Sequence, residues 1–234
     1  MGAIFRREVK AYFTSPIGYI FIAAFFAYSG IMFSATSLNS GYARLDGVFS
    51  NLLVIIIVLI PILTMRTIAE EKRSKTDQCL LTAPVSLGGI VAGKFFAALT
   101  VYIIAASVTV IMAVVVSVYG APDWNVIVGN IAALILVGAA YISIGIFCSS
   151  FTENQVVAAV LSFVLLLAVS FLSTIGDLVP VEWIRKACEK ISFGERYLSF
   201  TSGIFDFSHV VFFISASVAF LFLTVRVLEK RRWG

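Results

Sequence analysis

The sequence has few charged residues and few of the side chains on which enzyme chemistry depends. Charged residues make up 13 % of its 234 residues and hydrophobic residues 60 %, whereas an ordinary globular chain has about 25 % and about 45–50 %. This composition, with a mean hydropathy of +1.03, excludes a soluble protein and indicates an integral membrane protein. The net charge of +4 must then be interpreted by position relative to the bilayer, so it does not support nucleic-acid binding.

The sequence also lacks the clusters that hold metals or disulfides. Its single histidine, His209, excludes a multi-histidine metal or haem site. Its three cysteines, Cys79, Cys148 and Cys188, lie far apart without a Cys-x-x-Cys pair, so neither a zinc cluster nor a disulfide scaffold is indicated. We therefore expect no cofactor and no catalytic residue in this chain.

Six segments are long and apolar enough to cross a membrane, which takes about 20 residues of helix. They cover residues 17–37, 48–65, 95–118, 126–149, 155–175 and 208–225, and none contains Asp, Glu, Lys or Arg. The sequence therefore predicts an all-α integral membrane protein with six transmembrane helices, forming one domain over residues 1–234. With six spans both termini lie on one side. Twelve Lys and Arg lie on that side and five on the other, which predicts that both termini are cytoplasmic.

The absence of charge inside the predicted spans bears on how the protein could use energy. A carrier driven by protons or ions keeps an ionisable residue within the membrane, so these spans favour neither a secondary transporter nor a membrane enzyme. The connecting segments are too short to fold as a nucleotide-binding domain, because a chain below about 40 residues rarely buries enough surface. Any motor must be another chain. Spans lined by Ser, Thr, Tyr, Asn and aliphatic residues suit an amphipathic or hydrophobic substrate.

The first sixteen residues alternate apolar and charged side chains. On a helix, Ile4, Phe5 and Val9 would lie opposite Arg6 and Lys10, which is typical of an amphipathic helix in the membrane interface. A basic topology anchor without that role is the alternative.

The inner loop 66–94 is the most informative segment. Ser74 followed by Asp77 is typical of a helix start, and Pro84 disfavours helix at the residue before it. We expect a short cytoplasmic helix over about 75–82, too short to be stable alone, with Leu80 and Leu81 docked on a partner or on the spans. A solvated loop is the alternative.

The end of this loop contains a sequence similar to a phosphate-binding loop. Residues 88–94 fit Gly-x-x-x-x-Gly-Lys, but Phe95 follows where Ser or Thr should hold Mg²⁺. A buried strand should precede such a loop, and here a proline-broken segment precedes a membrane span. We therefore do not expect nucleotide binding, and we interpret Lys94 as a topology anchor at the interface.

Two further segments invite a functional interpretation. The polar turn at Thr152, Glu153 and Asn154 is either a simple hairpin turn or a second cytoplasmic contact. In the outer segment 176–207, hydrophobic residues recur at helical spacing opposite a charged face: Trp183, Ile184, Ala187, Cys188 and Ile191. This predicts an outer re-entrant amphipathic hairpin that dips into the outer leaflet. A surface helix without a gating role is the alternative.

Four segments resemble, in order and across the whole chain, parts of the type-2 ABC transporter (ABC-2) permeases. They are residues 6–16, residues 70–86 continued by 93–95, residues 152–160 and residues 228–233. Within this family, the single-domain permeases associated with gliding motility are the most similar in character. One departure is Leu87-Gly88-Gly89, where bulkier or more polar residues are typical.

The resemblance implies a permease subunit of an ATP-driven exporter in the cytoplasmic membrane of a prokaryote. It implies pairing with a second permease copy or a homologous permease, and with two ABC ATPase subunits that hold ATP and Mg²⁺. The residues that it assigns to ATPase coupling are Glu70, Glu71, Lys75, Thr76, Asp77, Leu80, Leu81 and Pro84. The outer hairpin, with Trp183, Ile184, Cys188 and Phe193, would close the exit. The residues alone also allow a stand-alone channel or carrier, or a membrane assembly factor that transports nothing.

Overall fold

The computed structural model describes residues 2–38, 45–76, 86–120, 123–177, 182–201 and 206–233, and within these ranges every regular element is a helix. The helices are α1 (Gly2–Thr14), α2 (Pro16–Phe33, continued by a π-helical turn Ser34–Leu38), α3 (Asp46–Thr64), α4 (Ala69–Arg73), α6 (Leu87–Ala106), α7 (Val108–Tyr119), α8 (Trp124–Ser149), α9 (Gln155–Ser170), α10 (Leu172–Asp177), α11 (Glu182–Ile191), α12 (Phe193–Thr201) and α13 (Phe207–Trp233).

Five helical segments are long and apolar enough to cross a membrane. They are Pro16–Leu38, Asp46–Arg73, Leu87–Val118, Trp124–Ser149 and Phe207–Arg231, and each contains or largely overlaps one predicted span. The prediction of an all-helical membrane protein is thus confirmed at this level. The segment predicted as a span over 155–175 differs, because α9 ends at Ser170 and α10 begins at Leu172. The 16 residues of α9 rise about 24 Å, less than the roughly 30 Å of a hydrocarbon core, so a sixth span stays a prediction.

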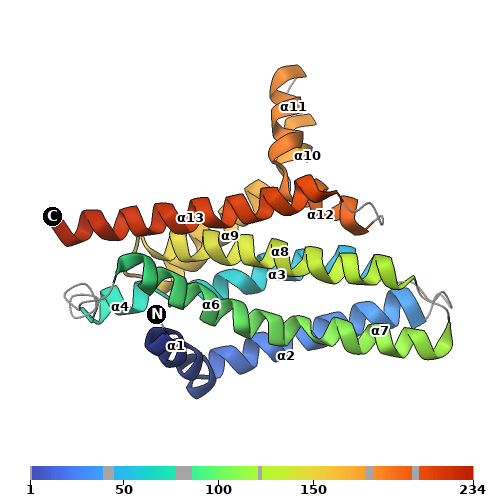
Figure 1. The fold of residues 1–234 in the computed structure, drawn as a ribbon, viewed down its shortest axis with the longest axis horizontal. Coiled ribbons are helices and arrows are strands. Elements are labelled where there is room, and N and C mark those ends of the chain that lie inside the picture. Colours follow the sequence, from blue (N-terminus) through green and yellow to red (C-terminus); the bar gives the residue numbers. More distant parts are fainter. Residues whose placement is uncertain are drawn as a thin grey trace.

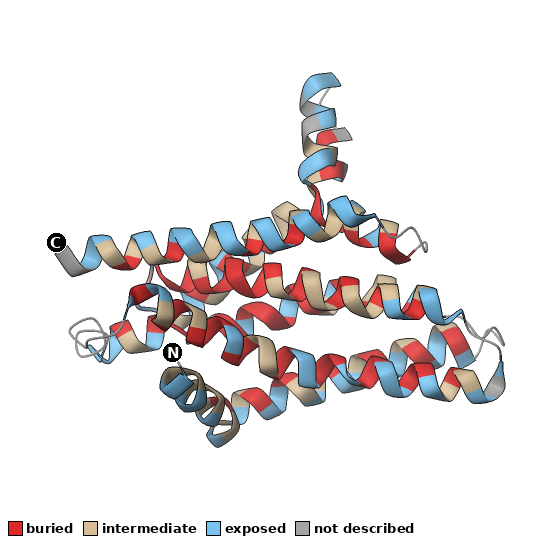
Figure 2. Ribbon diagram, viewed as in Figure 1, coloured by how far each residue is buried: buried red, intermediate tan, exposed pale blue. Residues whose placement is uncertain are grey.

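The long helices run side by side, and both chain termini lie toward one end of the bundle (Figure 1). We call this the terminal end and the opposite one the far end. Helix α8 lies at the centre and packs against α3, α6, α9, α12 and α13. Figure 2 shows buried residues facing the interior of the bundle and exposed ones on its outside. In the most apolar 18-residue stretch of each helix, 67 % of the residues of α8 are buried but only 17 % of those of α13, so α13 lies at the margin of the bundle.

Two glycines allow the central helix to approach its neighbours closely. A Cβ atom on Gly138 would lie 2.2 Å from the Tyr102 ring, and one on Gly145 would lie 2.2 Å from the Thr64 hydroxyl. The Tyr102 hydroxyl in turn donates a 2.7 Å hydrogen bond to the carbonyl of Leu134. Both positions on α8 therefore require a residue without a side chain.

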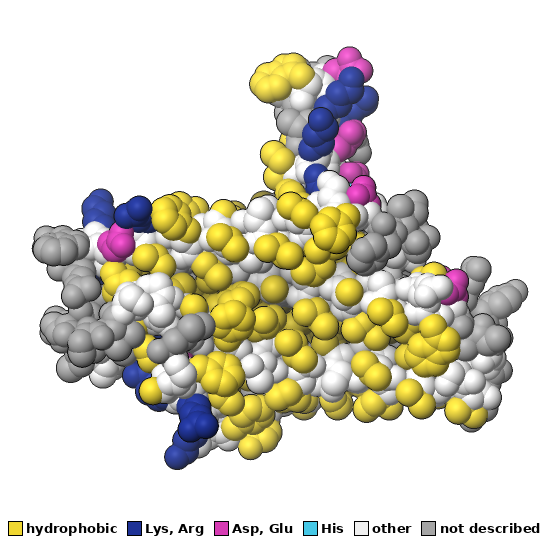
Figure 3. Space-filling model, viewed as in Figure 1, with side chains coloured by type: hydrophobic (Ala, Val, Ile, Leu, Met, Phe, Trp, Pro, Cys, Tyr) yellow, Lys and Arg dark blue, Asp and Glu magenta, His cyan; other side chains and the backbone are white. Residues whose placement is uncertain are grey.

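Helices α10 and α11 project outward from the side of the bundle (Figure 1). We call them the arm. In Figure 3, the hydrophobic side chains of the arm lie on the side that faces the terminal end, and the charged ones lie on the opposite side. The predicted helix over 183–191 thus corresponds to α11, and its amphipathic pattern is visible. Its position in a membrane stays a prediction.

Candidate functional site

A cluster of charged residues joins three helices at the terminal end. Lys94 on α6 lies 2.9 Å from a carboxylate oxygen of Glu71 on α4 and 3.2 Å from one of Glu8 on α1. Arg7 bridges the same two oxygens, at 2.7 Å from Glu8 and 2.6 Å from Glu71. We call Arg7, Glu8, Glu71 and Lys94 the terminal cluster. It balances two positive and two negative charges.

Lys94 is the buried centre of the terminal cluster, with only 2 % of its side chain exposed. It also donates a 2.7 Å hydrogen bond to the carbonyl of Thr67, in the segment that follows α3. A buried ammonium is tolerated only where it is paired and fully hydrogen-bonded. These three acceptors on different segments meet that requirement, and they explain why Lys94 does not reach outward as the anchor that the sequence suggested.

Close packing against α6 holds α1 next to the terminal cluster. A Cβ atom on Gly93 would lie 3.0 Å from the Ile4 side chain, so the glycine allows close contact between α1 and α6. The apolar residues Ile4, Phe5, Val9 and Phe13 pack against the core. The predicted amphipathic helix is therefore present, and a substantial part of its apolar face is covered by protein.

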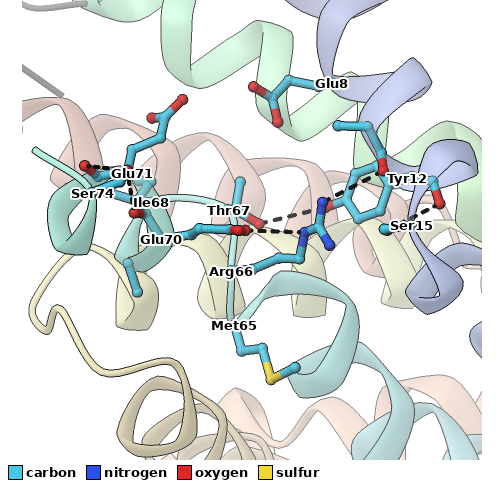
Figure 4. A network of polar contacts seen from close by, with 12 residues as sticks. Glu8, Tyr12, Ser15, Met65, Arg66, Thr67, Ile68, Glu70, Glu71 and Ser74 are labelled. Atoms are coloured by element: carbon cyan, nitrogen blue, oxygen red, sulfur yellow. Dashed lines mark hydrogen bonds and ion pairs between the residues drawn. The ribbon is translucent and has the colours of Figure 1, made fainter. Parts of the chain in front are cut away.

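A pocket of about 350 Å³ adjoins the terminal cluster, and Arg66, Glu70 and Tyr12 line it as well. Figure 4 shows Arg66 between the Glu70 carboxylate and the Tyr12 ring. The guanidinium lies 3.4 Å from Glu70 and 5.9 Å from the centre of the ring. The Tyr12 hydroxyl donates a 3.1 Å hydrogen bond to Leu63, and burial raises its pKa to about 12, so it stays neutral.

The charges of the terminal cluster stabilise one another. Burial alone would raise the pKa of the Glu8 carboxyl, but the positive charges of Lys94 and Arg7 outweigh it and hold this pKa below its ordinary value. The hydrogen bond to Glu8 is the main reason that the pKa of Arg7 is raised. Glu8 and Arg7 are therefore both charged at neutral pH.

The segment 65–76, which follows α3 and includes α4, is also bonded to α8. The Ser149 hydroxyl accepts hydrogen bonds from the backbone N–H groups of Ile68 and Ala69, both at 3.1 Å, and donates one to the carbonyl of Met65 at 3.1 Å. The ammonium of Lys72, itself buried, donates to the carbonyl of Ser150. The segment 65–76 is therefore fixed to α1 and α6 on one side and to the end of α8 on the other.

The residues predicted for ATPase coupling lie partly in this segment. Glu71 points inward to Lys94, whereas the Glu70 side chain is 51 % exposed. Lys75 and Thr76 are in a turn, so the described part of the predicted 75–82 helix is not helical. Asp77, Leu80, Leu81 and Pro84 lie outside the described residues.

The turn after α4 has a specific geometry. The N–H of Thr76 bonds the carbonyl of Glu71, and that of Lys75 bonds the carbonyl of Lys72, which is the hydrogen-bond pattern of a Schellman motif. Lys75 occupies the left-handed position of this motif, with φ 57°, where glycine is usual. The motif ends α4 and turns the chain toward residue 77.

The second predicted contact, the turn between α8 and α9, is held by its own polar residues. Asn154 caps α9 by accepting from the N–H of Val156 at 2.9 Å, and Thr152 accepts from the N–H of Asn154 at 3.1 Å. Glu153 forms a 3.2 Å ion pair with Arg231 near the end of α13. The Lys72 bond to the carbonyl of Ser150 places this turn next to the segment 65–76, and the Glu153 ion pair links it to the last helix.

The described side chains among the four residues predicted for the outer gate do not form one group. Phe193 is buried among Tyr141, Phe212 and Phe213, with ring centres 5.9, 5.1 and 5.4 Å away. Trp183, on the arm, is 73 % exposed. Cys188 packs against Gly176 within the arm, and the Ile184 side chain lies outside the described part.

The terminal cluster was missed at the level of sequence. Its only sequence signal is a lysine two turns inside a helix that is otherwise apolar, together with Glu8 at the boundary of an amphipathic face. The similarity to a phosphate-binding loop has a structural explanation, since residues 88–94 form the first turns of α6. In the ranges that the structure describes, no group of His, Cys, Asp and Glu could hold a metal ion.

Comparison with known families decides the class of this membrane protein. Residues 3–231 match the model of the ABC-2 family transporter proteins. The chain belongs to this family. Comparison with individually curated proteins gives no match. As an ABC-2 permease, the protein is a multi-pass membrane subunit, of a kind that is typically non-catalytic and associates with ABC ATPase subunits.

Proposed function

We propose that this ABC-2 permease is the transmembrane subunit of an ATP-driven exporter that moves an amphipathic or hydrophobic substrate across the cytoplasmic membrane. Two permease copies, or one copy and a homologous permease, would pair with two separate ATPase subunits. The terminal end would face the cytoplasm, as the Lys and Arg distribution predicts. In Figure 3, Lys and Arg lie at the terminal end and on the arm, with mostly hydrophobic side chains between them.

The observation that supports this proposal is the connectivity of the segment 65–76. It continues α3, its Glu71 is paired with α1 and α6, and it is hydrogen-bonded to Ser149 of α8. A force applied to this segment therefore acts on four helices at once. We infer that the ATPase subunit binds the adjoining residues, including Leu80 and Leu81, and that the exposed Glu70 is a charged contact in this interface.

In the same proposal, the turn at Thr152, Glu153 and Asn154 is a second contact for the ATPase. The arm would lie in the outer leaflet, since the apolar side of an amphipathic helix faces hydrocarbon. Phe193, buried where the arm meets the bundle, would couple movements of the arm to α8 and α13.

The test is reconstitution of the permease with its ATPase subunit in liposomes. Leu80→Asp or Leu81→Asp should abolish the stimulation of ATP hydrolysis by the permease and leave membrane insertion intact, because a charge is costly in an apolar docking contact. Leu38→Asp, at an exposed position of the far end, is the matched control and should retain stimulation. Substrate flux through the permease alone, without nucleotide, would contradict the proposal, as would full stimulation in both loop variants.

A further inference from the structure

One arginine joins three helices near the far end of the bundle. Arg196 on α12 donates two hydrogen bonds to the carbonyl of Lys190 in the last turn of α11, at 3.0 and 2.6 Å. Its third nitrogen lies 2.9 Å from Nδ1 of His209, in the first turn of α13. The guanidinium also lies 4.1 Å from the centre of the Phe212 ring. A single side chain therefore connects the arm to the last long helix.

This contact is compatible with only one protonation state of the histidine. A guanidinium has donors and no acceptor, so Nδ1 of His209 must carry a free lone pair and the ring proton must be on Nε2. A protonated imidazole has two N–H groups and no acceptor. We propose that Arg196 and His209 form a pH-dependent latch, which holds the arm against α13 while His209 is neutral and releases it when His209 is protonated.

The charged groups on the surrounding helices leave Arg196 as the partner of the ring. On α12, Glu195 is exposed, and on α11, Glu189 pairs with Arg185 at 3.6 Å. Asp206 caps α13 by accepting from the N–H of Ser208 at 2.8 Å. Of the other helices against α13, α8 has no charged residue between Trp124 and Ser149, and α6 has only the paired Lys94 of the terminal end.

The direction of the effect follows from the contact. Histidine is the side chain whose charge commonly changes between about pH 5 and pH 8. Neutral His209 accepts the hydrogen bond, so the latch is formed at the alkaline end of this range and is lost as the pH falls. Protonation would also place two positive charges next to each other. The latch concerns the position of the arm, so it does not depend on the proposed transport function.

The protonation state can be measured on the unaltered chain, because His209 is its only histidine. The full chain, labelled with ¹⁵N-histidine, purified with a tag that lacks histidine and held in detergent micelles, should show the Nε2–H tautomer at about pH 8. Arg196→Gln should change the tautomer signals. An Nδ1–H tautomer in the unaltered chain would overturn the pairing, and this measurement needs no variant to fold.

The release of the arm can be measured by amide hydrogen exchange of residues 182–191, which form α11, corrected for the intrinsic effect of pH. We expect exchange to be about tenfold faster at about pH 5.5 than at about pH 8, as for the loss of a hydrogen bond to a charged group. His209→Gln keeps an acceptor at every pH and should remove this difference. Arg196→Gln should exchange fast at both pH values. Arg185→Gln, which removes a guanidinium on α11 paired with Glu189, is the control and should keep the difference. Equal exchange at both pH values in the unaltered chain, or an undiminished difference in His209→Gln, refutes the latch.

Discussion

Replacing Lys94 by Met tests whether the terminal cluster holds α1 on the bundle. Met has a similar length and retains the apolar contacts of the stem, but it cannot bond Glu8, Glu71 or the carbonyl of Thr67. Removing one partner of a buried ion pair costs about 3–5 kcal/mol when the other charge is left unpaired. The expected result is that α1 detaches more easily while the rest of the bundle stays intact.

The free-energy cost of Lys94→Met should be lower than the cost of leaving a buried charge with no partner at all. Arg7 remains within 2.7 Å of Glu8 and 2.6 Å of Glu71, and the two carboxylate side chains are 13 % and 17 % exposed. Water and Arg7 therefore compensate part of the loss. We expect about 2–3 kcal/mol, which corresponds to roughly a 30- to 150-fold increase in the population with α1 detached.

Amide hydrogen exchange of residues 2–14 in the detergent-solubilised chain measures that population directly. In Lys94→Met, these amides should exchange faster by this factor, while amides in the middle of α8 should be unchanged. Lys10→Met is the matched control, because Lys10 is exposed on the same helix and its removal should have little effect. If the amides of α1 exchange at the same rate in Lys94→Met and in Lys10→Met, the terminal cluster does not fix this helix and the reasoning is wrong.

Three further outcomes are expected. The pKa of Glu8 is lowered, so its ionised form stabilises the docking of α1 above the ordinary value of 4.5, and this contribution is lost as the pH falls through the lowered value. After correction for the intrinsic effect of pH, acidification should therefore speed amide exchange in α1, and Glu8→Gln should weaken this dependence. Ser149→Ala removes three hydrogen bonds to the segment 65–76 and should lower thermal stability by about 1–3 kcal/mol, whereas Ser143→Ala, which affects a bond within α8, should change it little. Asn130 is buried and its amide has no partner among the described residues, so Asn130→Leu should raise thermal stability by about 1–3 kcal/mol; a lower melting temperature would show that the amide is satisfied.

The sequence predicts the positions of the apolar helices well, because hydrophobicity is a local property. It is less informative about what covers an apolar face. The pattern of α1 suggests contact with lipid, but a close approach at Gly93 lets Ile4 pack on α6. A glycine 89 positions further along the chain gives no sign in the sequence that it will receive this side chain.

The end of α9 is a second feature that the sequence pattern does not predict. The apolar run over 155–175 continues past Ser170, so composition alone predicts one long span. In the structure Ser192 donates to the carbonyl of Ser170 at 3.4 Å, and a Cβ atom on Gly194 would lie 2.3 Å from the same oxygen. The start of α12 therefore packs where α9 ends, and such a long-range contact is not encoded in the local pattern.

The pairing of charged residues is a third feature that the sequence pattern does not predict. Counting Lys and Arg predicts an orientation, but it treats each charge as a separate anchor. Lys94 and Glu8 lie 86 positions apart in the sequence, and only the fold brings them together. The same is true of Glu153, in the turn before α9, and Arg231, near the end of α13.

The docking of α1 on the bundle has a consequence for the insertion of the protein into the membrane during its synthesis. Helix α1 leaves the ribosome before the residues that hold it, because Glu71, Gly93 and Lys94 are synthesised only after two apolar helices have followed α1. During this interval the nascent segment cannot reach its final partners, and its amphipathic surface is best accommodated by phospholipid. The interfacial behaviour indicated by its residue pattern would then belong to biogenesis, and the docked helix to the mature permease.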